Sequence, residues 1–206
     1  MSAIAARVFL LSPARLDGRR STILIRPPAK FELAERLHRG EATIGEVYSF
    51  ISGLYFRGKV AYAAAFAGSP EGAASSLIIV PGTGLVPLEM LVSVEKVREF
   101  AGISIERDYD IYRAGLLRDA RLLEQASGPA CNFILLGSIA SSKYTAPLLE
   151  VFGDRLLFPA DFVGRGDMSR GGLMLRSAQA GVELEYKPVA VVLLRGSRPP
   201  KLSPIR

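Results

Sequence analysis

Ser76-Leu77-Ile78-Ile79-Val80 is the stretch of this sequence that decides its fold, and Pro81 ends it. Its apolar residues are continuous rather than alternating, which is typical of a strand buried on both faces. The run Phe133-Ile134-Leu135-Leu136 has the same character. Segments with helical spacing separate the two runs, and parallel strands need such crossovers. We therefore predict an α/β fold with a largely parallel, Rossmann-like three-layer sheet that has helices on both faces.

The rest of the chain extends this pattern in both directions. Thr43-Ile44-Gly45-Glu46 has the spacing of a capping box, which predicts that a helix starts there. No linker rich in proline, glycine and serine divides the chain, so we expect one domain over 1–194 and a basic, proline-rich tail over 195–206. Further strands are predicted at 7–11, 21–25, 155–158, 183–186 and 189–194, and helices at 30–39, 43–53, 54–67, 87–102, 110–127, 141–152 and 169–178.

Composition restricts the class of protein. An apolar fraction of 49% with 22% charged residues predicts a packed core rather than a disordered chain. No apolar run approaches the ~20 residues of a membrane-spanning helix, and the first residues do not have the pattern of a signal peptide. The single cysteine, Cys131, fits a reducing compartment and is better explained as a small buried hydrophobe than as a nucleophile. We expect a cytoplasmic protein with no membrane association.

The net charge of +6 raises the question of nucleic-acid binding. The tail carries four of the positive side chains, at Arg195, Arg198, Lys201 and Arg206, and it contains no acid. The remaining chain is nearly balanced. This distribution weakens the case for nucleic acid and leaves it as an alternative.

Ligands of open α/β sheets bind beyond the carboxyl ends of the strands. Four loops follow predicted strands, at 12–20, 81–87, 137–145 and 160–170. The third combines a strand, a glycine turn, hydroxyls, a lysine and a helix start, an arrangement that suits a phosphate or carboxylate. It lacks P-loop spacing, and a simple helix cap by Ser141 or Ser142 is the alternative. Its predicted ligand-binding residues are Gly137, Ser138, Ser141, Ser142 and Lys143.

The fourth loop concentrates acids, arginines and glycines between apolar segments. Asp161 and Asp167 are the predicted catalytic residues, because a carboxylate can serve as a general base. Arg165, Ser169 and Arg170 are predicted to bind an anion, since an arginine can hold phosphate through two hydrogen bonds. The alternative is a surface loop of Asp–Arg ion pairs.

The first and second loops are weaker candidates. Ser12 and Arg15, followed by Arg19 and Arg20, could form a basic lid over an anion or a solvated surface. Gly82 and Thr83 could let a ligand approach the backbone closely, although a plain turn is favoured. The third glycine of a dinucleotide fingerprint is missing after Gly84.

Other chemistries are disfavoured by the residues present. The only histidine, His38, lies in the last turn of a predicted helix, where its charge would complement the helix dipole. The sequence contains no Cys/His cluster that could bind zinc, and we predict no resident metal. Magnesium is the alternative, and its possible carboxylate ligands are Asp161, Asp167 or the pair Asp108 and Asp110. Arg57 and Lys59 flank Gly58 between aromatic residues, and we interpret this segment as a corner between two helices rather than as a site that binds a nucleic-acid base.

We therefore expect a binding protein or enzyme for a small phosphorylated or nucleotide-like ligand at the carboxyl edge of the sheet. If it is an enzyme, hydrolysis or glycosyl transfer through Asp161 or Asp167 fits better than histidine chemistry. The alternatives are a nucleic-acid-associated module that uses Arg15, Arg19, Arg20 and the tail, and a homo-oligomer built through the helices of 54–67. No cofactor is identified by the sequence.

Overall fold

The computed structural model describes residues 6–27, 29–68, 74–139 and 142–191 of the chain. Within these ranges a six-stranded sheet has the order β4-β3-β1-β6-β7-β8. Its four central strands are parallel and its two edge strands, β4 and β8, are antiparallel to their neighbours. The strands are β1 (Arg7–Leu11), β3 (Ser76–Val80), β4 (Gly84–Pro87), β6 (Asn132–Leu136), β7 (Leu156–Pro159) and β8 (Tyr186–Pro188).

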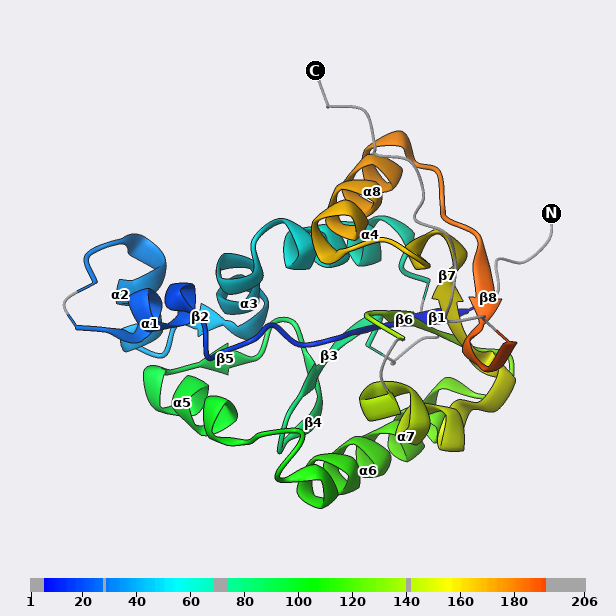
Figure 1. The fold of residues 1–206 in the computed structure, drawn as a ribbon, viewed down its shortest axis with the longest axis horizontal. Coiled ribbons are helices and arrows are strands. Elements are labelled where there is room, and N and C mark those ends of the chain that lie inside the picture. The colour runs from blue at the N-terminus through cyan, green and yellow to red at the C-terminus, as the bar shows by residue number, and fades with distance from the viewer. Residues whose placement is uncertain (1–5, 28, 69–73, 140–141, 192–206) are drawn as a thin grey trace.

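Helices cover both faces of this sheet (Figure 1). On one face, α4 (Leu54–Phe66) packs against α8 (Asp167–Ala180), and on the other, α6 (Tyr109–Ser127) packs against α7 (Ser142–Phe152). The strands between them are almost fully buried, since every residue from Val8 to Leu11 has no exposed surface. The prediction of an α/β fold with a largely parallel, three-layer sheet is confirmed, and the continuous apolar runs are its double-sided core strands.

A smaller lobe extends from the sheet on the left of Figure 1. The capping box predicted at its centre is present, because the Glu46 backbone N–H donates to Thr43 Oγ1 at 3.2 Å and the Thr43 N–H donates to the Glu46 carboxylate at 2.8 Å. Arg36 also binds this carboxylate and holds the pKa of Glu46 down at about 2. The lobe contains α1 (Arg19–Ile25), α2 (Glu32–His38), β2 (Ala42–Thr43), α3 (Ile44–Ser52), β5 (Leu91–Val92) and α5 (Val94–Gly102).

Four secondary-structure predictions were wrong. Residues 21–25 are helical, because Ser21 and Leu24 are buried three positions apart, and this is a helical and not a strand period. Residues 87–102 do not form one helix, because β4 folds back on β3 as a hairpin and α5 starts only after Ser93, which caps Lys96 N. Of the strand predicted at 183–186 only Tyr186 is in a strand, β8, and of the strand predicted at 189–194 the described residues form the 3-10 turn η3 (Val189–Val191). Two further 3-10 turns, η1 (Gly153–Arg155) and η2 (Ala160–Phe162), flank β7.

The strand order creates a topological switch point at β1. The chain passes from β1 to β3 on one side, and then returns across β1 to β6 on its other side. The segment that leaves β1 leads to the connection that carries α4, and the segment that leaves β6 leads to α7; these two helices lie on opposite faces of the sheet (Figure 1). The loops that leave β1 and β6 therefore diverge, and a crevice opens between them at the carboxyl edge.

Candidate functional site

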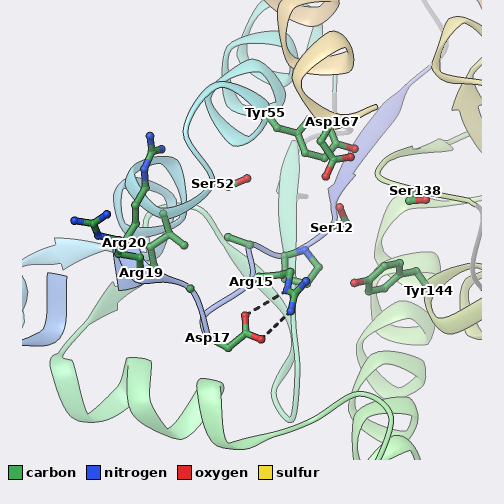
Figure 2. Close-up of a pocket in the computed structure, with 14 residues that line it drawn as sticks. Ser12, Arg15, Asp17, Arg19, Arg20, Ser52, Tyr55, Ser138, Tyr144 and Asp167 are labelled. Carbon is green, nitrogen blue, oxygen red and sulfur yellow. Dashed lines mark hydrogen bonds and ion pairs between the residues drawn. The ribbon is translucent and has the colours of Figure 1, made fainter. Parts of the chain in front are cut away.

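A pocket of about 600 Å³ lies at this switch point, and we call it the β1–β6 pocket (Figure 2). Most of its wall is the segment that leaves β1, from Ser12 to Arg20 without Leu16. The junction of α3 and α4 adds Ile51, Ser52 and Tyr55, and Ser138 lies just after β6. Tyr144 from α7 and Asp167 from the first turn of α8 complete it. The pocket thus joins parts of the chain that are far apart in sequence.

Arginines outnumber acids around this pocket. Arg15, Arg19 and Arg20 line it together with only two carboxylates, those of Asp17 and Asp167. Figure 2 shows Arg15 on the side of Ser12, Ser138 and Tyr144, whereas Arg19 and Arg20 extend toward the lobe. The Arg15 guanidinium donates two hydrogen bonds to Asp17, at 2.9 and 3.3 Å, and lowers the pKa of that carboxyl. Both side chains are mostly exposed, so solvent screens the attraction between them. Arg15 can therefore leave Asp17 for another anion at little cost in free energy.

A buried lysine lies directly beneath the pocket. The Lys59 ammonium group on α4 is within hydrogen-bond distance of Ser12 Oγ, at 2.7 Å, and of the Ser12 carbonyl oxygen, at 2.9 Å. Its nitrogen also lies 4.1 Å from the centre of the Tyr55 ring. Only 1% of Lys59 is exposed. The pKa of Lys59 falls to about 7, chiefly because the amine is buried; Asp167 opposes this shift and Arg170 adds to it.

The lysine is held there by an unusually close contact between α4 and α8. A Cβ atom at Gly58 would lie 2.6 Å from the Gly171 carbonyl oxygen, and one at Gly171 would lie 2.7 Å from the Leu54 carbonyl oxygen. Only glycine fits at both positions, so the helix backbones touch. This contact places Arg170 of α8 under the pocket, where it is 9% exposed and pairs with Asp167 at 3.5 Å.

A further glycine shapes the position of Ser12. A Cβ atom at Gly137, which follows β6, would lie 2.8 Å from Ser12 Cβ and 3.0 Å from Ser12 Oγ. Gly137 therefore leaves the space into which the Ser12 side chain fits between β6 and Lys59. Ser12 is 6% exposed and lines the pocket.

A second pocket, of about 460 Å³, lies on the other side of the segment that leaves β1, and we call it the β1–β3 pocket. Its walls combine aromatic and aliphatic side chains, such as Tyr48, Phe100 and Ile103, with the polar side chains of Glu106 and Lys143. The buried Tyr48 hydroxyl has no hydrogen-bond partner among the described residues. Both pockets share Pro13, Ala14, Arg15, Asp17 and Tyr144 as lining residues.

The structure brings part of the predicted site together. Ser12, Arg15, Ser138 and the predicted catalytic residue Asp167 all line the β1–β6 pocket. Gly137 packs on Ser12, and Arg170 lies beneath the pocket. The loops after β6 and before α8 therefore meet at one edge of the sheet.

Other predicted residues lie elsewhere. Lys143 pairs with Glu106 and lines the β1–β3 pocket. Arg165 donates to the Asp161 carbonyl oxygen and to Ser169 Oγ, so these three residues form a local cluster that is not part of the wall of either pocket. Gly82 and Thr83 form the turn between β3 and β4, Ser142 begins α7 at the surface, and Ser141 and the tail lie outside the described residues.

Lys59, which lies beneath the pocket, and Tyr55, which lines it, were not among the predicted site residues, and the segment around Lys59 was interpreted as a helix–helix corner. The available signal was a lysine four positions after Tyr55 and three before Tyr62, on the helical face that carries the buried aromatic residues of α4. A lysine on such a face is rarely buried unless it is paired. Its partner, Ser12, is distant in sequence, and no local pattern indicates it.

Metal, cysteine and membrane features add little to the site. In the described parts of the chain, no group of three or more His, Cys, Asp and Glu side chains is placed to hold a metal ion. Asp108 instead accepts a hydrogen bond from the Ser104 backbone N–H at 2.9 Å, just before α6. Cys131 is buried, which raises the pKa of its thiol. No helix within the described ranges has the length and apolar composition needed to cross a membrane.

Comparison with known proteins identifies no relative of this chain: no family model, no curated protein and no solved structure matches it. The site must therefore be interpreted from its own geometry.

Proposed function

We propose that the β1–β6 pocket binds a small phosphorylated or nucleotide-like ligand. The observation that carries this proposal is the position of an arginine-lined pocket at the topological switch point of a largely parallel sheet. Crevices at this position are where open α/β sheets bind their ligands. A volume of about 600 Å³ falls within the range of small-molecule sites.

Arg15 is the residue best placed to hold a phosphate group. Its guanidinium now binds the Asp17 carboxylate in an exposed, screened pair, and a phosphate offers the same two-pronged acceptor geometry. Ser12 and Ser138 add hydroxyl groups at the ends of β1 and β6. A dianionic phosphate would therefore gain a charged partner without the need to unfold any element.

The adjoining β1–β3 pocket could hold another part of the same ligand. The rings of Tyr48 and Phe100 suit a base or another flat group, and the Tyr48 hydroxyl offers a hydrogen-bonding group. Lys143 and Glu106 also line this pocket, as an ion pair. A ligand with a phosphate and a flat group that carries polar atoms matches the chemistry of the two pockets together.

Thermal-shift and calorimetric titration with inorganic phosphate, AMP and ribose 5-phosphate test this proposal. We expect at least one of them to stabilise the protein, and replacement of Arg15 by alanine to weaken its binding about tenfold, since a hydrogen bond to a charged group contributes about 1.5 kcal/mol. Arg118→Ala on α6 is the matched control, because Arg118 is an exposed arginine outside both pockets. Absence of binding by all three probes would refute the proposal.

The same arginines make nucleic acid the competing ligand. Oligonucleotide binding driven by Arg15, Arg19 and Arg20 should fall steeply as salt increases, because counterion release dominates such binding. If a single-stranded oligonucleotide binds with a steep salt dependence and AMP does not bind, the small-molecule proposal is wrong and the nucleic-acid alternative is favoured. Deletion of 195–206 then separates the contribution of the tail from that of the pocket.

A further inference from the structure

Ser12 and Lys59 form a pair that the anion-binding proposal does not require. Ser12 Oγ and Lys59 Nζ are 2.7 Å apart, and the lysine is almost completely buried while the serine lines the pocket. A lysine that only supported the end of β1 would need no contact with the hydroxyl, since it already has the Ser12 carbonyl oxygen at 2.9 Å. From this geometry we infer that Ser12 is a nucleophile, that Lys59 is its general base, and that the pair transfers a phosphoryl group from a phosphate ester.

The hydrogen bonds around Lys59 are satisfied when its amine is neutral. A neutral amine has two N–H groups and one lone pair, so it can donate to the Ser12 carbonyl oxygen, direct the second N–H at the Tyr55 ring, and accept the proton of the Ser12 hydroxyl. The hydroxyl then has the orientation from which a base removes its proton.

Burial, rather than the nearby charges, is the main reason that the Lys59 amine can be neutral near pH 7. Apart from Ser12 on β1 and the aromatic rings of Tyr55 and Phe56 on its own helix, the groups that act on it are Asp167 and Arg170 of α8. Asp167 favours the ammonium form, while Arg170 and burial oppose it, so the pKa of Lys59 falls to about 7. A base with a pKa near the working pH has both the neutral form and the proton affinity that catalysis needs.

The reaction balances without any metal or redox partner. Ser12 Oγ bonds to phosphorus, the bond between phosphorus and the ester oxygen breaks, and the serine proton moves to Lys59 Nζ. The leaving oxygen takes this proton from Lys59. Water then attacks the phosphoserine and gives a proton to Lys59, the bond between phosphorus and Ser12 Oγ breaks, and phosphate leaves as Lys59 returns the proton to Ser12 Oγ. Arg15 would stabilise the charge on the transferred phosphoryl oxygens.

This inference rests on the proposed function, because it places the phosphoryl group of the ligand in the β1–β6 pocket. Its test does not depend on phosphate binding, so the two can fail separately. Loss of AMP binding with intact serine reactivity would count against the ligand, whereas intact AMP binding with an inert Ser12 would count against the nucleophile.

The experiment is labelling of the full-length protein with an alkyl fluorophosphonate, in which a serine oxygen bonds to phosphorus and fluoride leaves. Mass spectrometry of the digested protein locates the label. We expect a single label on Ser12, with a rate that rises with pH and levels off above about pH 7, where Lys59 is neutral. Ser12→Ala should abolish the label, and Lys59→Met should slow it about a hundredfold, a typical contribution of a general base.

Lys187→Met is the control, because Lys187 is an exposed lysine on β8 outside both pockets. It should leave the labelling rate unchanged. If Lys59→Met fails to fold, the pH profile of the unaltered protein decides instead. Labelling spread over several serines, or a rate at Ser12 that keeps rising to about pH 9 without a plateau, would overturn the inference.

Discussion

The two faces of the sheet are covered by helix pairs that pack in different ways. On one face, α4 and α8 meet at Gly58 and Gly171, so their backbones touch and the polar groups of Lys59 and Arg170 are buried between them. On the other, α6 and α7 meet through side chains, with the Tyr112 and Tyr144 rings 6.3 Å apart.

The charged groups of the two faces differ in the same way. Between α6 and α7, Glu150 pairs with Arg113 and Arg121 at the surface, and all three side chains are about half exposed. The buried charges of the α4–α8 face lie directly under the β1–β6 pocket. Burial of a charge is costly, so a fold tolerates it where it is paired, and such perturbed groups gather at functional sites. The α4–α8 face therefore carries the buried polar groups beside the β1–β6 pocket, and the charged groups between α6 and α7 lie at the surface.

The largest effect is expected at the glycine contact. Gly171→Ala places a methyl group 2.7 Å from the Leu54 carbonyl oxygen and 2.8 Å from Tyr55 Cα, both backbone atoms, so the helices must separate. We expect a loss of about 3 kcal/mol in the free energy of unfolding, measured by urea denaturation. Gly102→Ala at the end of α5 is the control, because a Cβ there meets nothing within 4 Å.

Gly171→Ala should also slow fluorophosphonate labelling of Ser12, since Lys59 moves with α4. A substitution at Gly171 that costs no more than the one at Gly102 would show that the two helices do not depend on backbone contact.

The next effect concerns the pH dependence of stability. The pKa of Lys59 is about 7 in the folded protein, below the value of an exposed lysine, so from about pH 7 to pH 10 the unfolded chain binds more protons than the folded chain. The stability of the folded protein therefore rises with pH across this window. Relative to Lys59→Met, the unaltered protein should gain about 2 kcal/mol between pH 7 and pH 9, measured by urea denaturation at each pH.

The ionisation of the tyrosines affects both proteins equally and cancels in this comparison. Parallel pH curves for the two proteins would mean that Lys59 keeps its proton on folding, and they would remove the base from the inferred mechanism.

The smallest effect is expected on the other face. Glu150→Gln breaks two exposed ion pairs, with Arg113 and Arg121, whose contribution is screened by solvent. We expect a loss of about 0.5 kcal/mol and unchanged labelling of Ser12. A loss as large as that of Gly171→Ala would show that these exposed ion pairs stabilise the fold as much as the backbone contact of α4 and α8 does.

The fold was predictable because buried parallel strands leave a strong signal, the continuous apolar runs that became β3 and β6. Because ligands of such sheets bind at the carboxyl edge, the sequence also predicted site residues in the loops that follow the strands. Four of these residues, Ser12, Arg15, Ser138 and Asp167, line one pocket in the structure. The positions of the other predicted residues depend on partners that no local pattern shows, as in the pairing of Lys143 with Glu106.

The centre of the inferred mechanism was not predictable for a related reason. Lys59 lies beneath Ser12 only because Gly58 and Gly171 let two helices touch, and these residues are separated by more than half the chain. From the sequence alone, a glycine in a helix indicates only a low helix propensity. That it allows a second helix to pack closely can be recognised only once the position of that helix is known.

The segment that leaves β1 is a wall of both pockets, through Pro13, Ala14, Arg15 and Asp17. A ligand that draws Arg15 away from Asp17 in one pocket changes the shape and charge of the other. Occupancy of the two pockets is then thermodynamically coupled, and the coupling is reciprocal: whatever one occupant does to the affinity of the second, the second does equally to the first. If one ligand spans both pockets, as proposed, two fragments of it that each occupy one pocket should therefore affect each other's affinity.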